Sequence, residues 1–338
     1  MHYNIPVFIP HLGCPFQCVY CNQHYISGTL KAPGIDDVHT IIRQKLSTIK
    51  NGTATVEVAF FGGSFTCLPA SEQERYLNAV QPYMKDNVIS GIRLSTRPDY
   101  INEQNLELLK KYGVTTIELG VQSMDDEVLI AIGRGHSSSD VENAAVLIKK
   151  SGFDLGLQTM IGLPGDNENT CIATATRVID LNPDCVRIYP VLVLKDTGLE
   201  TLFRTGLYAP LSLEEAVHRT AGVLKMYILS GINVIKVGLH PSDDYEANGN
   251  LVAGPFHPSF REMVMSYVWK NEFEKAGILK PVINDPDQDI TIIVPKGQYN
   301  YAIGFKADNK NNLKKHFRRV RFKESDKLKR LEFNVDYR

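Results

Sequence analysis

The sequence predicts an α/β fold in which helices cover a parallel sheet. Short apolar, β-branched runs alternate regularly with longer amphipathic stretches from the N-terminus to about residue 195. Glycine and polar residues gather directly after several of these runs, where turns and loops are expected. Six runs have the length and composition of strands, namely residues 5–10, 56–61, 91–96, 116–121, 154–161 and 186–194.

Helices are expected between these strands. Asp36 is a suitable N-cap for a helix ending near Ile49, and Ser71 with Glu74 has the spacing of a capping box for a helix over 71–83. Three further helices are predicted over residues 102–112, 140–151 and 167–181. Because the carboxyl ends of parallel strands lie at one edge of a sheet, functional residues are expected in the loops that follow them.

After residue 195 the alternation loosens into a helix over 212–230, a strand over 232–239 and a helix over 259–275. The polar loop between the last two contains His240, Asp243, Asp244 and His257. These are possible metal or substrate ligands, but Asp beside Pro or Gly is ordinary in turns, and turns are favoured. A second turn, Gly162-Leu-Pro164-Gly165, is expected to be structural.

The pattern along the whole chain predicts three regions. We expect a core over residues 1–240, a polar loop and linking helix over 241–285, and a small basic domain over 286–338 (the C-terminal domain).

The composition is that of a globular protein, with 43% hydrophobic and 22% charged residues. Lys and Arg number 37 against 38 Asp and Glu, so the net charge indicates no class of partner, although the last ~50 residues are basic. No segment has the ~20 apolar residues of a membrane span and no export signal is present, so we expect a cytoplasmic protein without a membrane partner.

Three of the six cysteines are crowded into Cys14-Pro-Phe-Gln-Cys18-Val-Tyr-Cys21 (the cysteine loop). In a reducing compartment this pattern favours metal ligation over disulfides. Three thiolates can ligate three irons of a cubane cluster, whereas electron-transfer clusters usually take four cysteines, so one iron stays open to a cofactor. The alternative is structural zinc with His24 as fourth ligand, although zinc ligands more often come as two separated pairs. The remaining cysteines, Cys67, Cys171 and Cys185, lack ligand spacing and are expected to be inert.

The cysteine loop resembles the signature of the radical SAM superfamily, in which an aromatic residue, here Tyr20, precedes the last cysteine. The resemblance extends over about the first two hundred residues. It implies a partial (β/α)6 TIM-type barrel with a small α+β C-terminal extension. It also implies a 4Fe-4S cluster on Cys14, Cys18 and Cys21, with S-adenosyl-L-methionine (SAM) on the open iron. An electron from a flavodoxin- or ferredoxin-type donor would then cleave SAM to methionine and a 5′-deoxyadenosyl radical.

Later motifs extend the resemblance. Ser95-Thr-Arg97-Pro-Asp99-Tyr is similar to a stretch of the Elongator catalytic subunit, a tRNA-modifying member, although relatives usually carry Glu at the place of Ser95. The Gly-Gly-Ser that follows the second strand would meet the SAM amine, and Arg134, in Arg134-Gly-His, would meet its carboxylate. The alternative for Arg134 is an ordinary solvated arginine at a helix start. The alternative for Val191 is an apolar strand that only forms part of the core. The SAM contacts that the resemblance implies are Tyr20, Gly62, Gly63, Ser64, Ser95, Gln122, Arg134, Gln158 and Val191.

The C-terminal domain carries a separate signal. Residues 303–309 resemble weakly the Gly-x-x-Gly loop of KH RNA-binding modules, with Ala307 where the second glycine belongs. Basic residues follow, interleaved with aromatic ones, and such a face can hold phosphates while rings stack on bases. A solvated charged helix is the alternative. The predicted RNA contacts are Lys306, Lys310, Lys314, Lys315, Arg318, Arg319 and Arg321.

The leading hypothesis is therefore a radical SAM enzyme that acts on RNA, by resemblance to the Elongator subunit on tRNA. The chain has no room for that subunit's acetyltransferase domain, so carboxymethyl transfer is not implied. Two alternatives stay open. One is a radical SAM enzyme acting on a small molecule or tetrapyrrole, and the other is a non-catalytic cluster- or haem-binding chaperone on the same fold.

Overall fold

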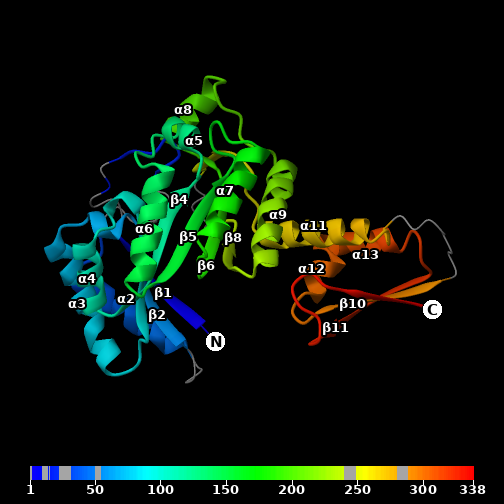
Figure 1. Cartoon of the computed structure of the whole chain (residues 1–338), viewed down its shortest axis with the longest axis horizontal. Coiled ribbons are helices and arrows are strands. Elements are labelled where there is room, and N and C mark those ends of the chain that lie inside the picture. Colours follow the sequence, from blue (N-terminus) through cyan, green and yellow to red (C-terminus); the bar gives the residue numbers. More distant parts are fainter. Residues whose placement is uncertain are drawn as a thin grey trace.

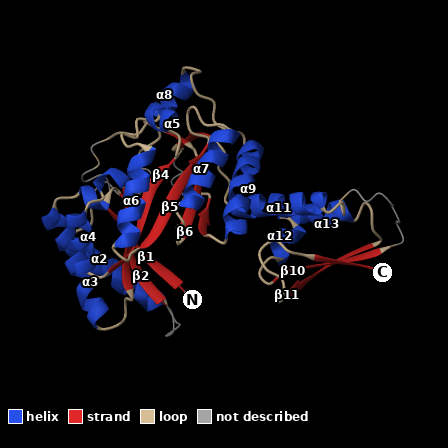
Figure 2. Ribbon diagram, in the orientation of Figure 1, coloured by secondary structure: helices blue, strands red, loops and turns tan. Residues whose placement is uncertain are grey.

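The computed structural model describes residues 2–9, 14, 16–22, 32–49, 55–239, 249–279 and 288–338. Seven parallel strands form one curled sheet in the order β1-β2-β3-β4-β5-β6-β8, with helices packed on its outer face (Figures 1 and 2). The predicted α/β partial barrel is thus confirmed, with a seventh strand added beside β6. The strands are β1 His2–Ile9, β2 Thr55–Gly62, β3 Gly91–Thr96, β4 Val114–Gln122, β5 Asp154–Ile161, β6 Cys185–Pro190 and β8 Asn233–Val237.

The sixth predicted strand is shorter than expected. It ends at Pro190, and the chain continues into β7 (Val193–Leu194), which pairs with β9 (Leu251–Ala253) in an antiparallel ribbon. Gly254 follows this ribbon with φ +116°, and a Cβ atom there would lie 3.1 Å from the carbonyl oxygen of Val191. A glycine therefore allows the ribbon to lie directly on the backbone that follows β6.

The predicted helices are present. They are α2 Ile35–Thr48, α3 Ala70–Lys85, α4 Glu103–Lys111, α6 Ser138–Lys150, α7 Glu168–Asp180, α9 Leu213–Ser230 and α11 Phe260–Lys275. Two short helices, α5 Asp126–Ala131 and α8 Gly198–Arg204, were not expected. No helix in the described ranges is long and apolar enough to cross a membrane.

Two predicted caps are wrong. The N-cap of α2 is Gly34, whose backbone N–H donates to the Asp37 side chain at 2.9 Å, so Asp36 already lies inside the first turn. The N-cap of α3 is Pro69, without a side-chain hydrogen bond, so Ser71 also lies inside its helix. The fixed φ of proline suits a helix start, and α3 therefore begins before the predicted capping box.

The C-terminal domain has a three-stranded sheet in the order β11-β10-β12, with β10 parallel to β11 and antiparallel to β12. Two short helices and a 3-10 turn connect the first two strands. The elements are β10 Asp289–Pro295, α12 Tyr299–Ile303, the turn Phe305–Ala307, α13 Asp308–Leu313, β11 Arg319–Ser325 and β12 Asn334–Tyr337. The loop residues His240, Asp243 and Asp244 lie outside the described residues.

Helix α11 joins the two parts of the molecule (Figure 1). Toward the barrel, Glu272 pairs with Lys225 of α9. Toward the C-terminal domain, Trp269 and Phe273 are fully buried, and both rings make edge-to-face contacts with Phe333. The aromatic side chains of α11 are therefore part of the core of the C-terminal domain.

Phe273→Ala should destabilise this core by about 3–5 kcal/mol, because it leaves a cavity among buried rings. Trp269 is the only tryptophan of the chain, so its fluorescence during urea unfolding reports this region. Val146→Ala, at a position that is 62% exposed on α6, should change stability by less than about 0.5 kcal/mol. An unchanged fluorescence midpoint in the Phe273 variant would contradict this packing.

Candidate active site

The cysteine loop lies at the carboxyl end of the barrel, on a segment made by residues 132–136 (the platform). The Val19 N–H donates to the carbonyl oxygen of Ile132 at 3.0 Å, and the Leu199 N–H donates to the Val19 carbonyl at 2.6 Å. The turn before the last cysteine is thereby bonded both to the end of α5 and to the start of α8. These two short helices, which periodicity did not predict, position the loop.

Close packing holds the start of the cysteine loop on the platform. A Cβ atom at Gly135, whose φ is +76°, would lie only 2.3 Å from the Phe16 ring, so only glycine fits there. On another side of the same ring, the Arg97 guanidinium lies 4.5 Å from its centroid. The aromatic residue between the first two cysteines is thus enclosed by a glycine and a cation.

Two buried arginines lie in this region, and one of them, Arg134, has no carboxylate partner among the described side chains. Arg134 donates from Nη2 to the Gly120 carbonyl at 2.8 Å, and its Nη1 lies 3.6 Å from Cys18 Sγ. Arg97 makes a bidentate pair with Asp99 at 2.9 and 3.0 Å and donates to the Arg134 carbonyl at 2.7 Å. Among the described residues, Arg134 Nε and Arg97 Nη1 are buried without a hydrogen-bond partner.

The pKa values of neighbouring side chains reflect the positive charge of Arg134. Burial, and then the charges of Arg134 and Arg97, lower the pKa of His136 to about 3, so its imidazole is neutral at physiological pH. Burial raises the pKa of Tyr20 well above its ordinary value, although Arg134 acts in the opposite direction. An anion beside Arg134 would therefore be stabilised by a charge that has no carboxylate partner among the described side chains.

The cysteines separate into two groups. All six lie in the described part of the chain and none forms a disulfide. Cys14 and Cys21 are half-buried and Cys18 is buried, and across the described residues no three His, Cys, Asp or Glu side chains are already arranged as a metal site. His24, the fourth ligand of the zinc alternative, lies outside the described residues. Soft thiolates beside an arginine are nevertheless a donor set that suits an anionic iron–sulfur cluster.

The other cysteines have environments of inert thiols. Cys171 and Cys185 are buried and Cys67 is half-buried. Burial raises the pKa of Cys67 and of Cys185 to about 11 in each case. A thiol that stays protonated at neutral pH is a poor ligand and a poor nucleophile.

The predicted contact Ser64 connects two strand ends. Its hydroxyl lies 2.9 Å from Thr96 Oγ1 and accepts from the Arg97 backbone N–H at 3.0 Å. Gly63 and Ser64 also line a small hollow with Phe60, Phe61 and other apolar residues. Gly62, with φ +104°, is packed so closely that a Cβ atom would lie 3.2 Å from the Ile9 carbonyl oxygen. The Gly-Gly-Ser motif therefore lies at the end of β2, beside the strand that leads into the cysteine loop.

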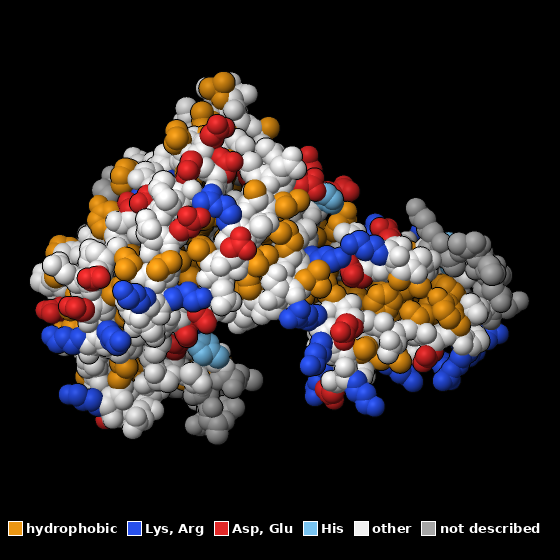
Figure 3. All heavy atoms as spheres, in the orientation of Figure 1, with side chains coloured by type: hydrophobic (Ala, Val, Ile, Leu, Met, Phe, Trp, Pro, Cys, Tyr) orange, Lys and Arg blue, Asp and Glu red, His pale blue; other side chains and the backbone are white. Residues whose placement is uncertain are grey.

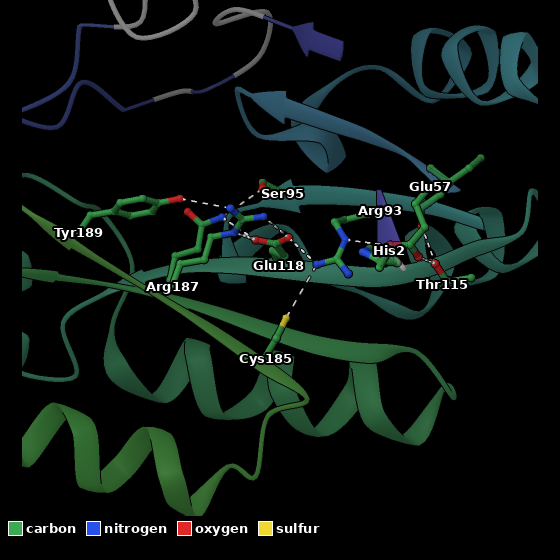
Figure 4. A network of polar contacts seen from close by, with 11 residues as sticks. His2, Glu57, Arg93, Ser95, Thr115, Glu118, Cys185, Arg187 and Tyr189 are labelled. Carbon is green, nitrogen blue, oxygen red and sulfur yellow. Dashed lines mark hydrogen bonds and ion pairs between the residues drawn. The ribbon is translucent and has the colours of Figure 1, made fainter. Parts of the chain in front are cut away.

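Ser95 and Gln158, predicted separately as SAM contacts, contact each other. Gln158 Nε2 donates to Ser95 Oγ at 3.1 Å and to Glu118 Oε2 at 3.2 Å. Ser95 lies beside a network of charged residues (Figure 4), and Gln158 joins this network through Glu118. Gln122 ends β4 with φ +68°, a conformation uncommon for a non-glycine residue, and Val191 is fully buried after β6.

A buried ionic network crosses the inner face of the barrel (Figure 4). Glu118, 1% exposed, accepts from Arg187 Nε at 2.5 Å, from Arg187 Nη2 at 3.0 Å and from Arg93 Nη1 at 2.8 Å. Arg93 Nε also donates to Glu57 at 3.1 Å. Gly156, opposite Glu118 in the next strand, leaves the necessary space, since a Cβ atom there would lie 2.6 Å from Glu118 Cγ.

This network was not predicted from the sequence. The pattern that indicates it is a single charged residue in the middle of each of three otherwise apolar strands, namely Arg93, Glu118 and Arg187. Burial alone would raise the pKa of Glu118, but Arg187 and Arg93 outweigh it and hold the pKa below its usual range. The network thus keeps one carboxylate ionised inside the barrel.

The predicted RNA contacts lie on more than one side of the C-terminal domain. Lys306, Lys314, Lys315, Arg318, Arg319 and Arg321 are exposed and Lys310 is half-buried. Arg318 pairs with Asp289 at 2.8 Å, and Lys315 donates to Asn312 at 2.9 Å.

Two family models match the chain. One, described as the radical SAM superfamily, matches residues 8–178, and the other, described as the radical SAM C-terminal domain, matches residues 183–270. A solved structure of the archaeal Methanocaldococcus infernus Elp3 with an N-terminal deletion has the same fold, with a TM-score of 0.64 and 23% identity over 84% of this chain and 69% of that one.

Curated relatives match mainly in the barrel. A tRNA uridine(34) acetyltransferase of Methanocaldococcus infernus is 31% identical over 195 residues, covering 52% of this chain and 36% of the relative. Elongator complex protein 3 of Homo sapiens is 28% identical, covering 54% and 37%. An uncharacterized protein of Methanocaldococcus jannaschii is 30% identical, covering 62% and 67%. The chain thus spans about a third of the length of the acetyltransferase and of the human protein.

Glu118→Gln should lower the free energy of unfolding by about 3 kcal/mol, because it leaves the buried Arg187 without its carboxylate and leaves Arg93 with Glu57 alone. The ionised carboxylate stabilises the fold fully above the unfolded-state pKa of about 4.3, and this contribution is lost as the pH falls through the lower folded-state pKa. The free energy of unfolding should therefore fall less between neutral and acid pH in the variant than in the wild-type protein. Urea unfolding near neutral pH and in acid measures both effects.

The exposed Glu107→Gln on α4 is the matched control and should change stability by less than about 0.5 kcal/mol. Equal stabilities of the Glu118 and Glu107 variants would show that the network contributes nothing.

Proposed function

Because the chain belongs to the radical SAM superfamily of enzymes, we propose that it cleaves SAM reductively at a 4Fe-4S cluster bound by Cys14, Cys18 and Cys21. The observation that carries this proposal is the buried Arg134 beside Cys18, in a loop of the superfamily's cysteine spacing. When bound, the cluster and SAM supply the redox chemistry. The chain's own residues hold the loop on the platform and provide the positive field around it.

Each element has a role in this proposal. Arg134 directs a guanidinium with an unpartnered Nε toward the region of the thiols, which suits a cluster or the SAM carboxylate. Gly63 and Ser64 line a hollow at the end of the neighbouring strand, where backbone can approach a bound amine closely. Ser95 and Gln158 are already hydrogen-bonded to each other, so a ribose at this position would be held by an oriented pair.

We further propose that the substrate is RNA, and specifically tRNA. Two observations support this: relatives with about 30% identity in the barrel are tRNA uridine(34) acetyltransferases, and the C-terminal domain is basic. The acetyl transfer named for those relatives is not carried over, because the shared region is only about a third of their length. The reducing partner is proposed to be a flavodoxin- or ferredoxin-type donor.

Cys18→Ala should abolish both iron–sulfur content and reductive formation of 5′-deoxyadenosine from SAM, since it removes the ligand beside Arg134. Anaerobic reconstitution, iron and sulfide analysis, and a dithionite assay with SAM measure this. Cys171→Ala removes a buried thiol far from the cysteine loop in sequence and should retain both properties. A Cys18 variant with its full complement of iron and sulfide would refute the ligand assignment, and zinc without sulfide in the wild-type protein would refute the cluster.

Addition of tRNA to the reduced protein with SAM should increase 5′-deoxyadenosine formation and change the mass of the RNA. The same assay with a tetrapyrrole or with metabolite extract tests the small-molecule alternative. SAM cleavage that responds to metabolites and not to tRNA would refute the RNA substrate. Absence of any cleavage by protein with a complete cluster would instead favour the chaperone.

A further inference from the structure

The C-terminal domain differs sharply in charge from the rest of the chain. Residues 288–338 contain 13 Lys and Arg against 6 Asp and Glu, whereas residues 1–287 contain 24 against 32. Figure 3 shows Lys and Arg side chains gathered along the lower edge of this domain. A concentration of one sign in a small domain within a near-neutral chain suits a polyanionic ligand.

One turn of this domain has an unusual backbone. Lys306 and Ala307 have φ values of +52° and +62°, a left-handed conformation that costs of order 1 kcal/mol for each residue with a side chain. The turn lies between α12 and α13, and its Lys306 side chain is exposed. Strained backbone of this kind persists only where surrounding contacts fix it, and it is typical of ligand clamps.

Helix α11 supplies those contacts. The Ser266 hydroxyl accepts from the Phe305 N–H at 2.9 Å, and the fully buried Asn309 donates to the Ser266 carbonyl at 3.0 Å. A Cβ atom at Gly304 would lie 2.8 Å from the Asn309 backbone nitrogen, so only glycine fits at the first position of the turn. The turn is therefore held rigidly from behind, with Lys306 on the solvent side.

The turn also contacts the segment between β9 and α11. The ring of Phe305 lies edge-to-face with His257, with centroids 5.5 Å apart. His257 lines a hollow with Pro190, the last residue of β6, and with Leu239, which follows β8. Lys306 is therefore one residue from a ring that contacts His257, and His257 lines a hollow at the carboxyl ends of β6 and β8.

Six of the 13 cations of the domain form two sets of three. Lys306, Lys310 and Lys314 (the turn-side lysines) lie in the turn and along α13, and none pairs with a carboxylate in the described ranges. Arg319, Arg321 and Lys323 (the sheet-side cations) alternate with the buried Val320 and Phe322 of β11. Because Phe322 contacts rings of α11 and α12, the sheet-side cations lie on the opposite face, away from the helices.

The sheet face carries acidic residues as well. Asp289 of β10 is opposite Arg319 of β11. Arg321 is opposite Thr291 of β10, which is in turn opposite Asp336 of β12, so Arg321 and Asp336 lie in the same row across the sheet. Asp336 opposes binding of a polyanion there, and so does Asp289, although Asp289 already pairs with Arg318. On the turn side, Asp308 is the only acidic residue between Lys306 and Lys314 in the sequence. The turn side, which also contacts His257, is therefore the better anion surface.

We propose that the turn Gly304–Ala307 and the turn-side lysines clamp the phosphodiester backbone of the RNA substrate beside the open edge of the barrel. Lys310 lies in α13 and Lys314 is its C-cap, whose N–H donates to the Lys310 carbonyl at 3.1 Å, so the two residues are one helical turn apart on one side of α13, about 6 Å along its axis. Repeated point charges of this kind suit successive phosphates better than the scattered carboxylates of a protein surface. The inference rests on the proposed RNA substrate and adds the surface that holds it.

Two triple variants of the full-length, cluster-loaded protein test this. One carries K306Q, K310Q and K314Q, and the other carries R319Q, R321Q and K323Q, which removes the same charge from the sheet side. Fluorescence anisotropy with labelled bulk tRNA should show at least about tenfold weaker binding for the turn-side variant. The slope of log affinity against log salt should fall by about three, one for each phosphate contact. The sheet-side variant should stay within about threefold of wild type.

Equal loss in both variants would overturn the clamp, since only total charge would then matter. Displacement of tRNA by polyglutamate as readily as by unlabelled tRNA would overturn RNA as the ligand in favour of an acidic protein. Thermal unfolding checks that both variants fold, which exposed Lys→Gln changes should allow.

The SAM cleavage assay without RNA separates this inference from the proposed function. The turn-side variant should form 5′-deoxyadenosine at the wild-type rate with dithionite alone. Normal cleavage with unchanged tRNA binding would refute the clamp and leave the enzyme activity intact. Specific tRNA binding by a protein that cannot cleave SAM would refute the activity and leave the clamp intact.

Discussion

The arrangement of this site depends on two guanidinium groups buried beneath a loop of cysteines. Arg97 is neutralised by Asp99, whereas Arg134 is held by a backbone carbonyl and lies near a thiol. Burying a charge without a full counter-charge is costly, so the surrounding structure must enforce it. Glycine at position 135, the Val19–Ile132 hydrogen bond and the short helices α5 and α8 do this by fixing the loop and the arginine in one place.

The parts of the fold that follow from local pattern were predictable. The six strands were identified because each is a short β-branched run, whereas the three cysteines are proposed as cluster ligands because their spacing is specific. Helices α5 and α8 were missed because six or seven residues are too few for helical periodicity to show. The platform and the Arg93–Glu118–Arg187 network depend on contacts between residues far apart in sequence, which a pattern along the chain does not encode.

The evidence for the function of the barrel differs from the evidence for the function of the C-terminal domain. The matches to family models end at residue 270, within α11, so the three-stranded sheet lies beyond them. Interpretation of that domain therefore depends on its own charge, its strained turn and its contact with His257. The weak resemblance to a KH loop falls on the turn bounded by Gly304 and Ala307, between two short helices, and stays a prediction.

Helix α11 has a mechanical consequence. Its sixteen residues form a rod about 24 Å long that begins against Gly238, just after β8, and ends among the rings of the other core. A lever of this kind cannot tilt at one end without displacing the other. A load on the small domain would thus be transmitted as torque to the last strand of the barrel, with no hinge inside the helix to absorb it.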